Sequence, residues 1–153
     1  ASFDKLKLIL EDLNQKAKDN GLTLEIINKE KENFIEADEY MIGQLFYNLL
    51  DNAIKYTKEG GVTVTIIHQN EDILVKISDT GIGISDEYLP RLFDPFTQEE
   101  TGYTRKYEGN GLGLSLVKKY SEMNNVRIEV KSKKNVGTEF TVIFKKHIVK
   151  PEN

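Results

Sequence analysis

The sequence contains no cysteine, so disulfides and thiolate chemistry are excluded and a reducing compartment is compatible with it. It also lacks any apolar run near the roughly 20 residues that a membrane-spanning helix needs, and no signal-peptide pattern opens it. We therefore expect a cytoplasmic domain that makes no membrane contact of its own. A membrane anchor elsewhere in a parent protein would be compatible with this expectation.

Long runs of one charge are absent too, and the formal net charge is only −4. This pattern indicates neither a nucleic-acid partner nor a disordered tail. At 153 residues the chain is long enough to bury one core without a disulfide or metal staple. We therefore expect a single domain over residues 1–153, with one site.

Helical spacing of apolar residues, with cap and stop signals, predicts helices over residues 6–17, 39–57, 85–93 and 109–125. Asp38 is the expected cap of the second helix, and Pro90 limits the first turn of the short third one. Runs rich in β-branched residues predict strands over residues 22–27, 62–69, 73–79, 126–132 and 137–145, with a further short strand possible in "FIEAD". Because most strands come in adjacent pairs, we expect an α/β (α+β) two-layer sandwich with a mixed, largely antiparallel sheet covered on one face by helices.

Three glycines stand at alternate positions in "GNGLGLSL", at the start of the last helix. The first N–H groups of a helix lack internal partners, so Gly109, Gly111 and Gly113 could seat a phosphate. The spacing matches neither the dinucleotide fingerprint nor a P-loop. A flexible loop closing onto a helix explains these glycines equally well.

The motif "SDTGIGIS" places Asp79 at the end of a strand, followed by Gly81 and Gly83. The carboxylate could simply cap its own turn. Alternatively, it accepts a hydrogen bond from the amine of a base, while the glycines let the ring approach the backbone.

The long helix carries Asn48, Asn52 and Lys55 within roughly 60° of one another, with Gln44 beside them. A solvated helix edge would explain Lys55 or Asp51, but it explains two asparagines inside a helix less well. Amide oxygens suit Mg²⁺, and a lysine one turn on can pair with phosphate. Together, the three motifs indicate a site for Mg²⁺ and a nucleoside triphosphate.

These motifs resemble those of the catalytic ATP-binding domain of two-component sensor histidine kinases, which shares a superfamily with gyrase-type topoisomerases, Hsp90-type chaperones and mismatch-repair ATPases. "NLLDNAIKYT" is similar to the N box, "DTGIGI" and "GNGLGLSL" to the two glycine boxes, and "LFDPF" to the F box. The resemblance covers nearly the whole chain and implies the Bergerat-type ATP-binding fold. ATP and Mg²⁺ are the implied cofactors.

The resemblance also implies roles for individual residues. Asp79 would hold the adenine amino group, with Thr138 helping through water, and Asn52 and Asn48 would serve the metal. The first helical N–H groups of the last helix would meet the phosphates. The full set of implied nucleotide-binding residues is Asn48, Asn52, Lys55, Tyr56, Asp79, Gly81, Gly83, Ile84, Leu92, Gly109, Gly111, Leu112, Gly113, Leu114 and Thr138.

Asn48 stands where ATP-hydrolysing relatives carry a water-activating glutamate. Amides cannot act as general bases, so transfer of the γ-phosphate is favoured over hydrolysis. Many family members have an arginine two residues after the F box's second phenylalanine, but this chain has Gln98 there. Positive charge would then come from the lid that we expect over residues 97–108, and the implied catalytic residues are Asn48, Lys55, Arg105 and Lys106.

Neither His68 nor His147 lies in the histidine-acid helical context of the family's phosphoacceptor. We therefore expect the substrate histidine on separate dimerisation helices of the parent kinase, absent from this chain, with a response regulator downstream and a monomer in isolation. An ATP hydrolase, a nucleotide-binding sensor or scaffold module without transfer, and a serine-phosphorylating regulator are the alternatives.

Overall fold

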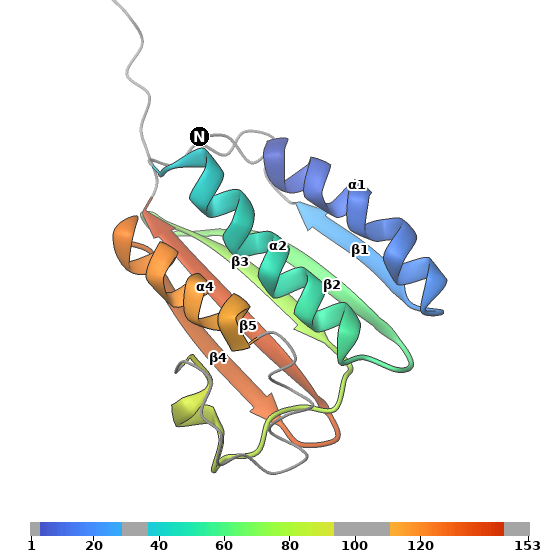
Figure 1. Ribbon diagram of the computed structural model, residues 1–153. Coiled ribbons are helices and arrows are strands. Elements are labelled where there is room, and N and C mark those ends of the chain that lie inside the picture. Colours follow the sequence, from blue (N-terminus) through green and yellow to red (C-terminus); the bar gives the residue numbers. More distant parts are fainter. Residues whose placement is uncertain (1–3, 29–36, 94–110, 146–153) are drawn as a thin grey trace, which may run out of the picture.

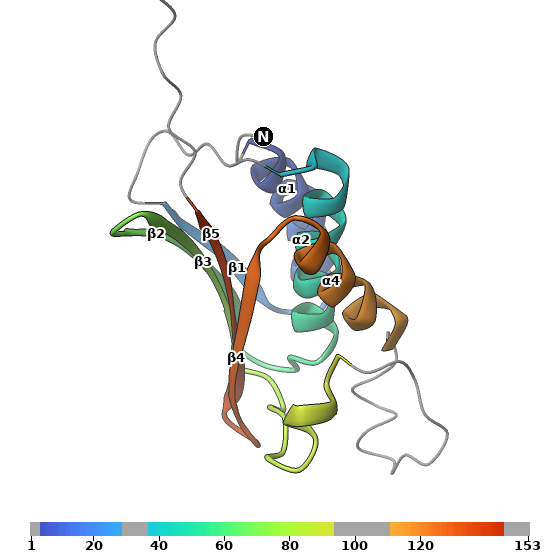
Figure 2. The same cartoon turned by 90° about the vertical axis from the view of Figure 1, so that its left-hand side faces the viewer.

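A five-stranded sheet, in the order β1-β2-β3-β5-β4, forms one layer of the structure, and helices cover one of its faces (Figures 1 and 2). The computed structural model describes residues 4–28, 37–93 and 111–145. The strands are β1 (Thr23–Asn28), β2 (Gly61–Gln69), β3 (Asp72–Asp79), β4 (Arg127–Lys133) and β5 (Gly137–Lys145). The helices are α1 (Asp4–Asp19), α2 (Glu39–Lys55) and α4 (Gly111–Met123), with a short 3₁₀ turn, η1 (Leu89–Arg91).

The sheet is mixed, as the sequence predicts. Strand β1 pairs in parallel with β2, and α2 is part of the connection between them, as a parallel pair requires. Tight hairpins join β2 to β3 and β4 to β5, and β3 and β5 are also antiparallel neighbours. The expected α/β sandwich with helices on one face is therefore confirmed.

Helix α2 lies between α1 and α4 (Figure 1) and forms the centre of the helical layer. Asp38 caps it as predicted, because its Oδ1 accepts a hydrogen bond of 2.8 Å from the N–H of Met41. The apolar face of α2 packs against alternate residues of β2 and β3, which point to the same side of the sheet. The core side chains that are fully buried include Phe46, Phe140, Phe144, Leu45, Leu49, Leu50, Ile54, Ile73 and Ile77.

The helix expected over residues 85–93 is wrong in type and extent, because only Leu89–Arg91 is helical and it is a 3₁₀ turn. Pro90 has no N–H and cannot continue the hydrogen-bond ladder of an α-helix. The segment instead forms hydrogen bonds between residues three apart, as in a 3₁₀ helix. The N–H of Tyr88 reaches the carbonyl of Ser85 at 3.0 Å, and that of Arg91 reaches the carbonyl of Tyr88 at 2.8 Å.

Two other expected features lie wholly or mostly outside the described residues: the short strand in "FIEAD" and the lid over 97–108. Of the first, Ala37 and Asp38 are described and are not in a strand. Within the described part of the chain, no helix is long and apolar enough to span a membrane.

Candidate nucleotide site

Asp79 is the last residue of β3, where it pairs with Thr138 of β5. Its Oδ1 accepts two backbone hydrogen bonds, one of 2.8 Å from the N–H of Gly81 and one of 3.3 Å from the N–H of Thr138. No donor in the described part of the chain is recorded on Oδ2. The carboxylate is thus fixed through one oxygen, and its other oxygen is available to a ligand.

Burial raises the pKa of Asp79 from its ordinary value of 3.8 to about 6, although the hydrogen bonds from Gly81 and Thr138 oppose the shift. The carboxylate is still mainly ionised at neutral pH. A partly buried, ionised carboxylate with one oxygen lacking a donor is well suited to accept a hydrogen bond from an exocyclic amine. It is also the kind of perturbed group that gathers at functional sites.

The loop after Asp79 runs against the end of α2. The N–H of Ile82 donates to the carbonyl of Tyr56 at 3.1 Å, and Gly81 lies so close to the same carbonyl that a Cβ would collide with it. Gly83 adopts a φ of +71°, and a side chain there would strike the backbone carbonyl of Lys133. Both predicted glycines are therefore required by the backbone path that sets the position of Asp79.

Ser132 of β4 holds the neighbouring part of this loop. Its Oγ accepts a hydrogen bond of 2.7 Å from the N–H of Ile84, lies 2.8 Å from the Oγ1 of Thr138, and donates to the carbonyl of Gly137 at 3.0 Å. Ser132 cannot be identified from the sequence, because a serine in an amphipathic strand carries no local signal of this contact. Thr138 was predicted, and it lies next to Asp79 as expected for a residue of the same site.

The three predicted polar residues of α2 lie in different environments. Asn48 is half-buried, Asn52 is only 1% exposed, and Lys55 is exposed. Neither Oδ1 nor Nδ2 of Asn52 has a hydrogen-bond partner among the described residues. An unpartnered buried amide costs about 1–3 kcal/mol, so Asn52 is held in an unfavourable state that a ligand would relieve.

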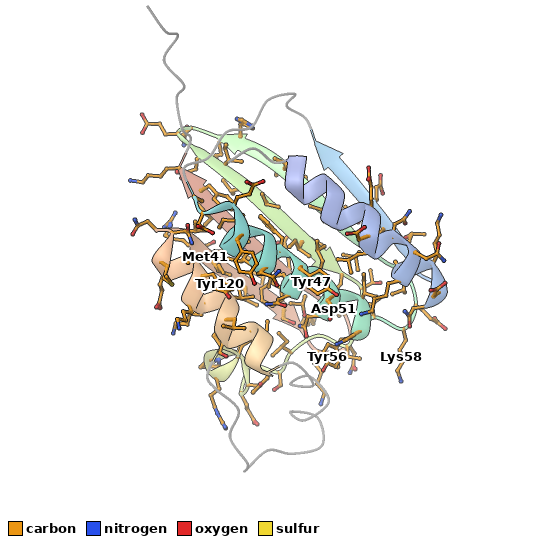
Figure 3. All side chains as sticks on the ribbon, turned by 45° about the horizontal axis from the view of Figure 1, so that its top comes forward. Met41, Tyr47, Asp51, Tyr56, Lys58 and Tyr120 are labelled. Carbon is orange, nitrogen blue, oxygen red and sulfur yellow. The ribbon has the colours of Figure 1, made fainter. Side chains whose placement is uncertain are left out.

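Asp51 and Lys16 form a contact that has no local signal in the sequence. A solvated helix edge would explain Asp51 from the sequence alone, yet the residue is only 6% exposed. Its Oδ1 is paired with the ammonium group of Lys16 from α1, and its Oδ2 lies 3.1 Å from the ammonium group of Lys55 (Asp51 is labelled in Figure 3). Burial raises the pKa of Asp51, but the hydrogen bonds from the two lysines outweigh it, and the net pKa is lowered.

The remaining predicted residues lie in or near the core, or outside the described residues. Leu92 and Leu114 are each 1% exposed and Ile84 is fully buried, while Tyr56 is half-buried beside the core. Gly111, Leu112, Gly113 and Leu114 open α4, so their N–H groups belong to its first turn, as the phosphate-seat prediction requires. Gly109, Arg105 and Lys106 lie outside the described residues.

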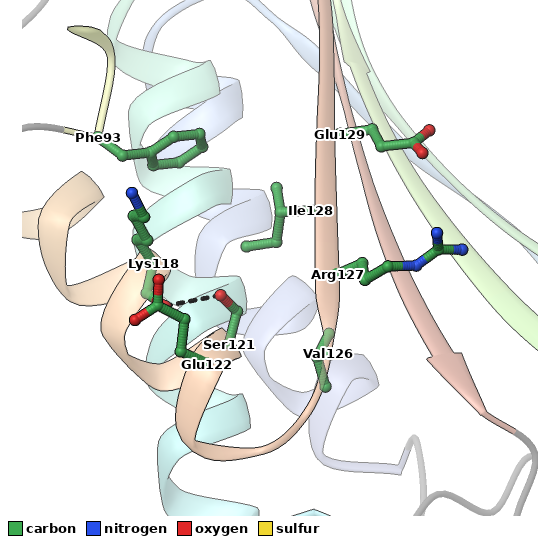
Figure 4. Close-up of a pocket in the computed structure, with 8 residues that line it drawn as sticks. All are labelled: Phe93, Lys118, Ser121, Glu122, Val126, Arg127, Ile128 and Glu129. Carbon is green, nitrogen blue, oxygen red and sulfur yellow. Dashed lines mark hydrogen bonds between the residues drawn. The ribbon is translucent and has the colours of Figure 1, made fainter. Parts of the chain in front are cut away.

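Phe93 packs edge-to-face on Phe140 with ring centroids 6.3 Å apart, so the F box is anchored on the core through this residue. It also lines a pocket of about 320 Å³ between α4 and β4 (Figure 4). The other lining residues are Lys118, Ser121, Glu122, Val126, Arg127, Ile128 and Glu129. None of the predicted nucleotide residues lines this pocket, so it is a separate feature of the surface.

Comparison with known proteins identifies the class. Residues 37–148 match the family described as histidine kinase-, DNA gyrase B-, and HSP90-like ATPase. The chain therefore belongs to this family, and the matched range contains all the predicted nucleotide residues.

The particular relatives are sensor kinases. The autoinducer 2 sensor kinase/phosphatase LuxQ of Vibrio parahaemolyticus is 38% identical over 149 residues, which cover 92% of this chain and 17% of LuxQ. The sensor histidine kinase RcsC of Escherichia coli is 37% identical over 108 residues, which cover 71% of this chain and 11% of RcsC. The predicted resemblance to the ATP-binding domain of sensor histidine kinases is confirmed, and the chain spans less than a fifth of the length of these relatives.

Solved structures agree. Full-length ShkA in complex with AMPPNP is 26% identical, with a TM-score of 0.82 over 97% of this chain and 32% of ShkA. The catalytic domain of the histidine kinase ThkA has a TM-score of 0.79, covering 94% of this chain and 91% of that domain, and at 24% identity it supports the fold alone.

Proposed function

We propose that this chain binds Mg-ATP beside Asp79 and transfers the γ-phosphate to a histidine on separate helices of its parent protein, within a two-component signalling system. The observation that carries the proposal is Asp79, a partly buried carboxylate fixed through Oδ1, with Oδ2 left without a donor in the described part of the chain. That oxygen would accept the amine of adenine. Gly81 and Gly83 would hold the loop in the path that sets the position of Asp79, because a Cβ at either glycine would collide with a neighbouring backbone carbonyl.

The phosphates would extend from Asp79 toward α2 and the start of α4. Lys55 and Tyr56 end α2, and the N–H groups of residues 111–114 begin α4, so both elements would offer donors to phosphate oxygens. Arg105 and Lys106 would add positive charge from the lid. Catalysis of phosphoryl transfer is mainly positioning and charge neutralisation, which this set of residues would supply.

Mg²⁺ fits the residues present. Asn52 has a buried amide whose oxygen has no hydrogen-bond partner among the described residues, and an amide oxygen is a hard ligand that Mg²⁺ accepts. Asn48, one turn before it on the same helix, would hold a metal-bound water or a phosphate oxygen. When bound, the ion would neutralise charge on the phosphates.

Asn48 also bears on the fate of the phosphate. An amide cannot take a proton from water, so this chain lacks a base at the position where hydrolysing relatives carry glutamate. A histidine nitrogen that arrives with its lone pair available needs no base for attack. We therefore favour transfer to a protein acceptor over release to water, with a response regulator as the next partner.

The test uses γ-labelled ATP and the parent kinase's own dimerisation helices, supplied as a separate protein. The expected result is label on the acceptor that is lost in acid and retained in base, as a phosphohistidine is. Free phosphate should stay at background, and Asp79→Asn should abolish labelling. Steady release of free phosphate without labelling would favour the hydrolase, and ATP binding with neither outcome would favour the sensor or scaffold module.

A further inference from the structure

Asp51 bridges two lysines that come from different helices. Its side chain is only 9% exposed, whereas the side chains of Lys16 and Lys55 are each 41% exposed. Lys16 lies in the last turn of α1, and Lys55 lies in the last turn of α2. The bridge therefore connects the end of the first helix to a residue predicted to face the phosphates.

The position of Lys55 on α2 lets its side chain point either toward Asp51 or toward Asn52. At about 100° per residue, Lys55 is about 40° from Asp51 and about 60° from Asn52 around the axis of α2. Its flexible stem can reach the carboxylate on one side or a group beside Asn52 on the other. In the structure it is directed to Asp51, with 3.1 Å between Nζ and Oδ2.

If Lys55 turned away from Asp51, the buried carboxylate of Asp51 would lose one cationic partner and would need another. A buried carboxylate that loses its partner carries a large desolvation penalty. Lys16 prevents this, because it pairs with the other oxygen of Asp51 and comes from a different helix. The packing of α1 on α2, with Leu13 and Ala17 both buried, keeps Lys16 beside the carboxylate.

We propose that Asp51 is a positioning residue for Lys55, and that Lys16 of α1 keeps Asp51 paired so that Lys55 can turn to the phosphates of the nucleotide. This rests on the proposed function, in which Lys55 contacts phosphate. It adds a dependence of phosphate binding on α1, which contributes none of the predicted nucleotide residues. A displacement of α1 that withdrew Lys16 would leave Lys55 bound to Asp51 and would weaken binding of the triphosphate.

The test is a set of affinities for AMPPNP with Mg²⁺, measured by calorimetry, and for adenosine, measured by ligand-observed NMR. Lys16→Met should weaken AMPPNP binding by about ten-fold, since one charge-assisted contact to phosphate is weakened, and should leave adenosine binding unchanged. Lys18→Met is the matched control, because it removes the same charge from the exposed side of the same turn. It should change neither affinity.

Two double variants separate positioning from a merely structural role. In a Lys55→Met background, Lys16→Met should have no further effect on AMPPNP, because there is no ammonium group left to release. In an Asp51→Asn background, Lys16→Met should again have no effect, because the neutral amide no longer retains Lys55. If Lys16→Met lowered the affinity for AMPPNP in either background as much as it does in the wild type, the proposal would be overturned.

Other outcomes separate the positioning role of Asp51 and Lys16 from the proposed binding of ATP. Equal loss of adenosine and AMPPNP affinity in Lys16→Met would mean that Lys16 only stabilises the domain, and it would overturn the positioning role. Tight AMPPNP binding that Lys55→Met does not alter would also overturn it, while the proposed function would stand. No binding of either ligand by the wild type would remove the proposed function itself, and the positioning role with it.

Discussion

The substitution Asp79→Asn should stabilise the protein while it removes nucleotide binding. Folding raises the pKa of Asp79 from 3.8 to about 6, so the native state binds a proton more tightly than the unfolded chain. Stability from this group is therefore fully present below about pH 4 and is lost as the pH rises toward 6. At about 1.4 kcal/mol for each pKa unit, the ionised carboxylate costs about 3 kcal/mol at neutral pH.

Asparagine removes that cost and keeps an oxygen for the N–H groups of Gly81 and Thr138. These hydrogen bonds become weaker because the acceptor is no longer charged. We expect a net gain of about 1–3 kcal/mol in the free energy of unfolding at neutral pH. Calorimetry on the same variant should show no binding of an ATP analogue.

The assay is urea unfolding of the wild type and Asp79→Asn at several values between about pH 4 and pH 7.5. Subtracting the two free energies at each pH cancels the contributions of all other titrating groups. The advantage of the variant should be largest above pH 6 and should shrink toward pH 4. A variant that is less stable than the wild type at neutral pH, or an advantage that does not depend on pH, would refute the reasoning.

Three further substitutions test other parts of the site. Asn52→Leu removes a buried amide that has no partner among the described residues, and it should raise the free energy of unfolding by about 1 kcal/mol. The same variant should show no effect of Mg²⁺ on nucleotide affinity. A variant less stable than the wild type would contradict this reasoning. Gly83→Ala places a side chain at a φ of +71° against the carbonyl of Lys133, and thermal unfolding should show a loss of at least about 2 kcal/mol. Ser132→Ala leaves the N–H of Ile84 without its acceptor and should cost about 1–2 kcal/mol in urea unfolding, with no loss indicating that water replaces the hydroxyl.

Much of the fold could be predicted because its signals are local. Only a few residues separate the two strands of each hairpin, β2–β3 and β4–β5, and alternating apolar residues fix which face of each strand is buried. The parallel pairing of β1 with β2 has no such local signal. The two strands are far apart in the sequence, and their pairing depends on how the intervening helix α2 packs on the sheet. The segment 85–93 differs from the α-helix that its apolar spacing predicts, because Pro90 lacks the N–H that an α-helix would use there and only a 3₁₀ turn forms.

Local and tertiary signals differ in the candidate site too. The pattern that points to Asp79, a carboxylate at a strand end followed by alternating glycines, is local, and in the structure this carboxylate lies at the end of β3 beside Thr138. The contact of Asp51 could not be predicted, because only the tertiary packing of α1 on α2 buries it and brings Lys16 to it. From the sequence alone, a charged residue on a helix edge is expected to be exposed to solvent. Asp51 is buried because the neighbouring helix covers it.

The most direct test of the central claim is a calorimetric titration of the wild-type chain with AMPPNP, once with Mg²⁺ and once with a chelator in its place. Binding of ATP beside Asp79 predicts heat with an affinity in the micromolar range, and a contribution from Asn52 predicts that removing Mg²⁺ changes that affinity. An absence of binding under both conditions, from a chain shown to be folded, would contradict the claim and leave only the family's fold.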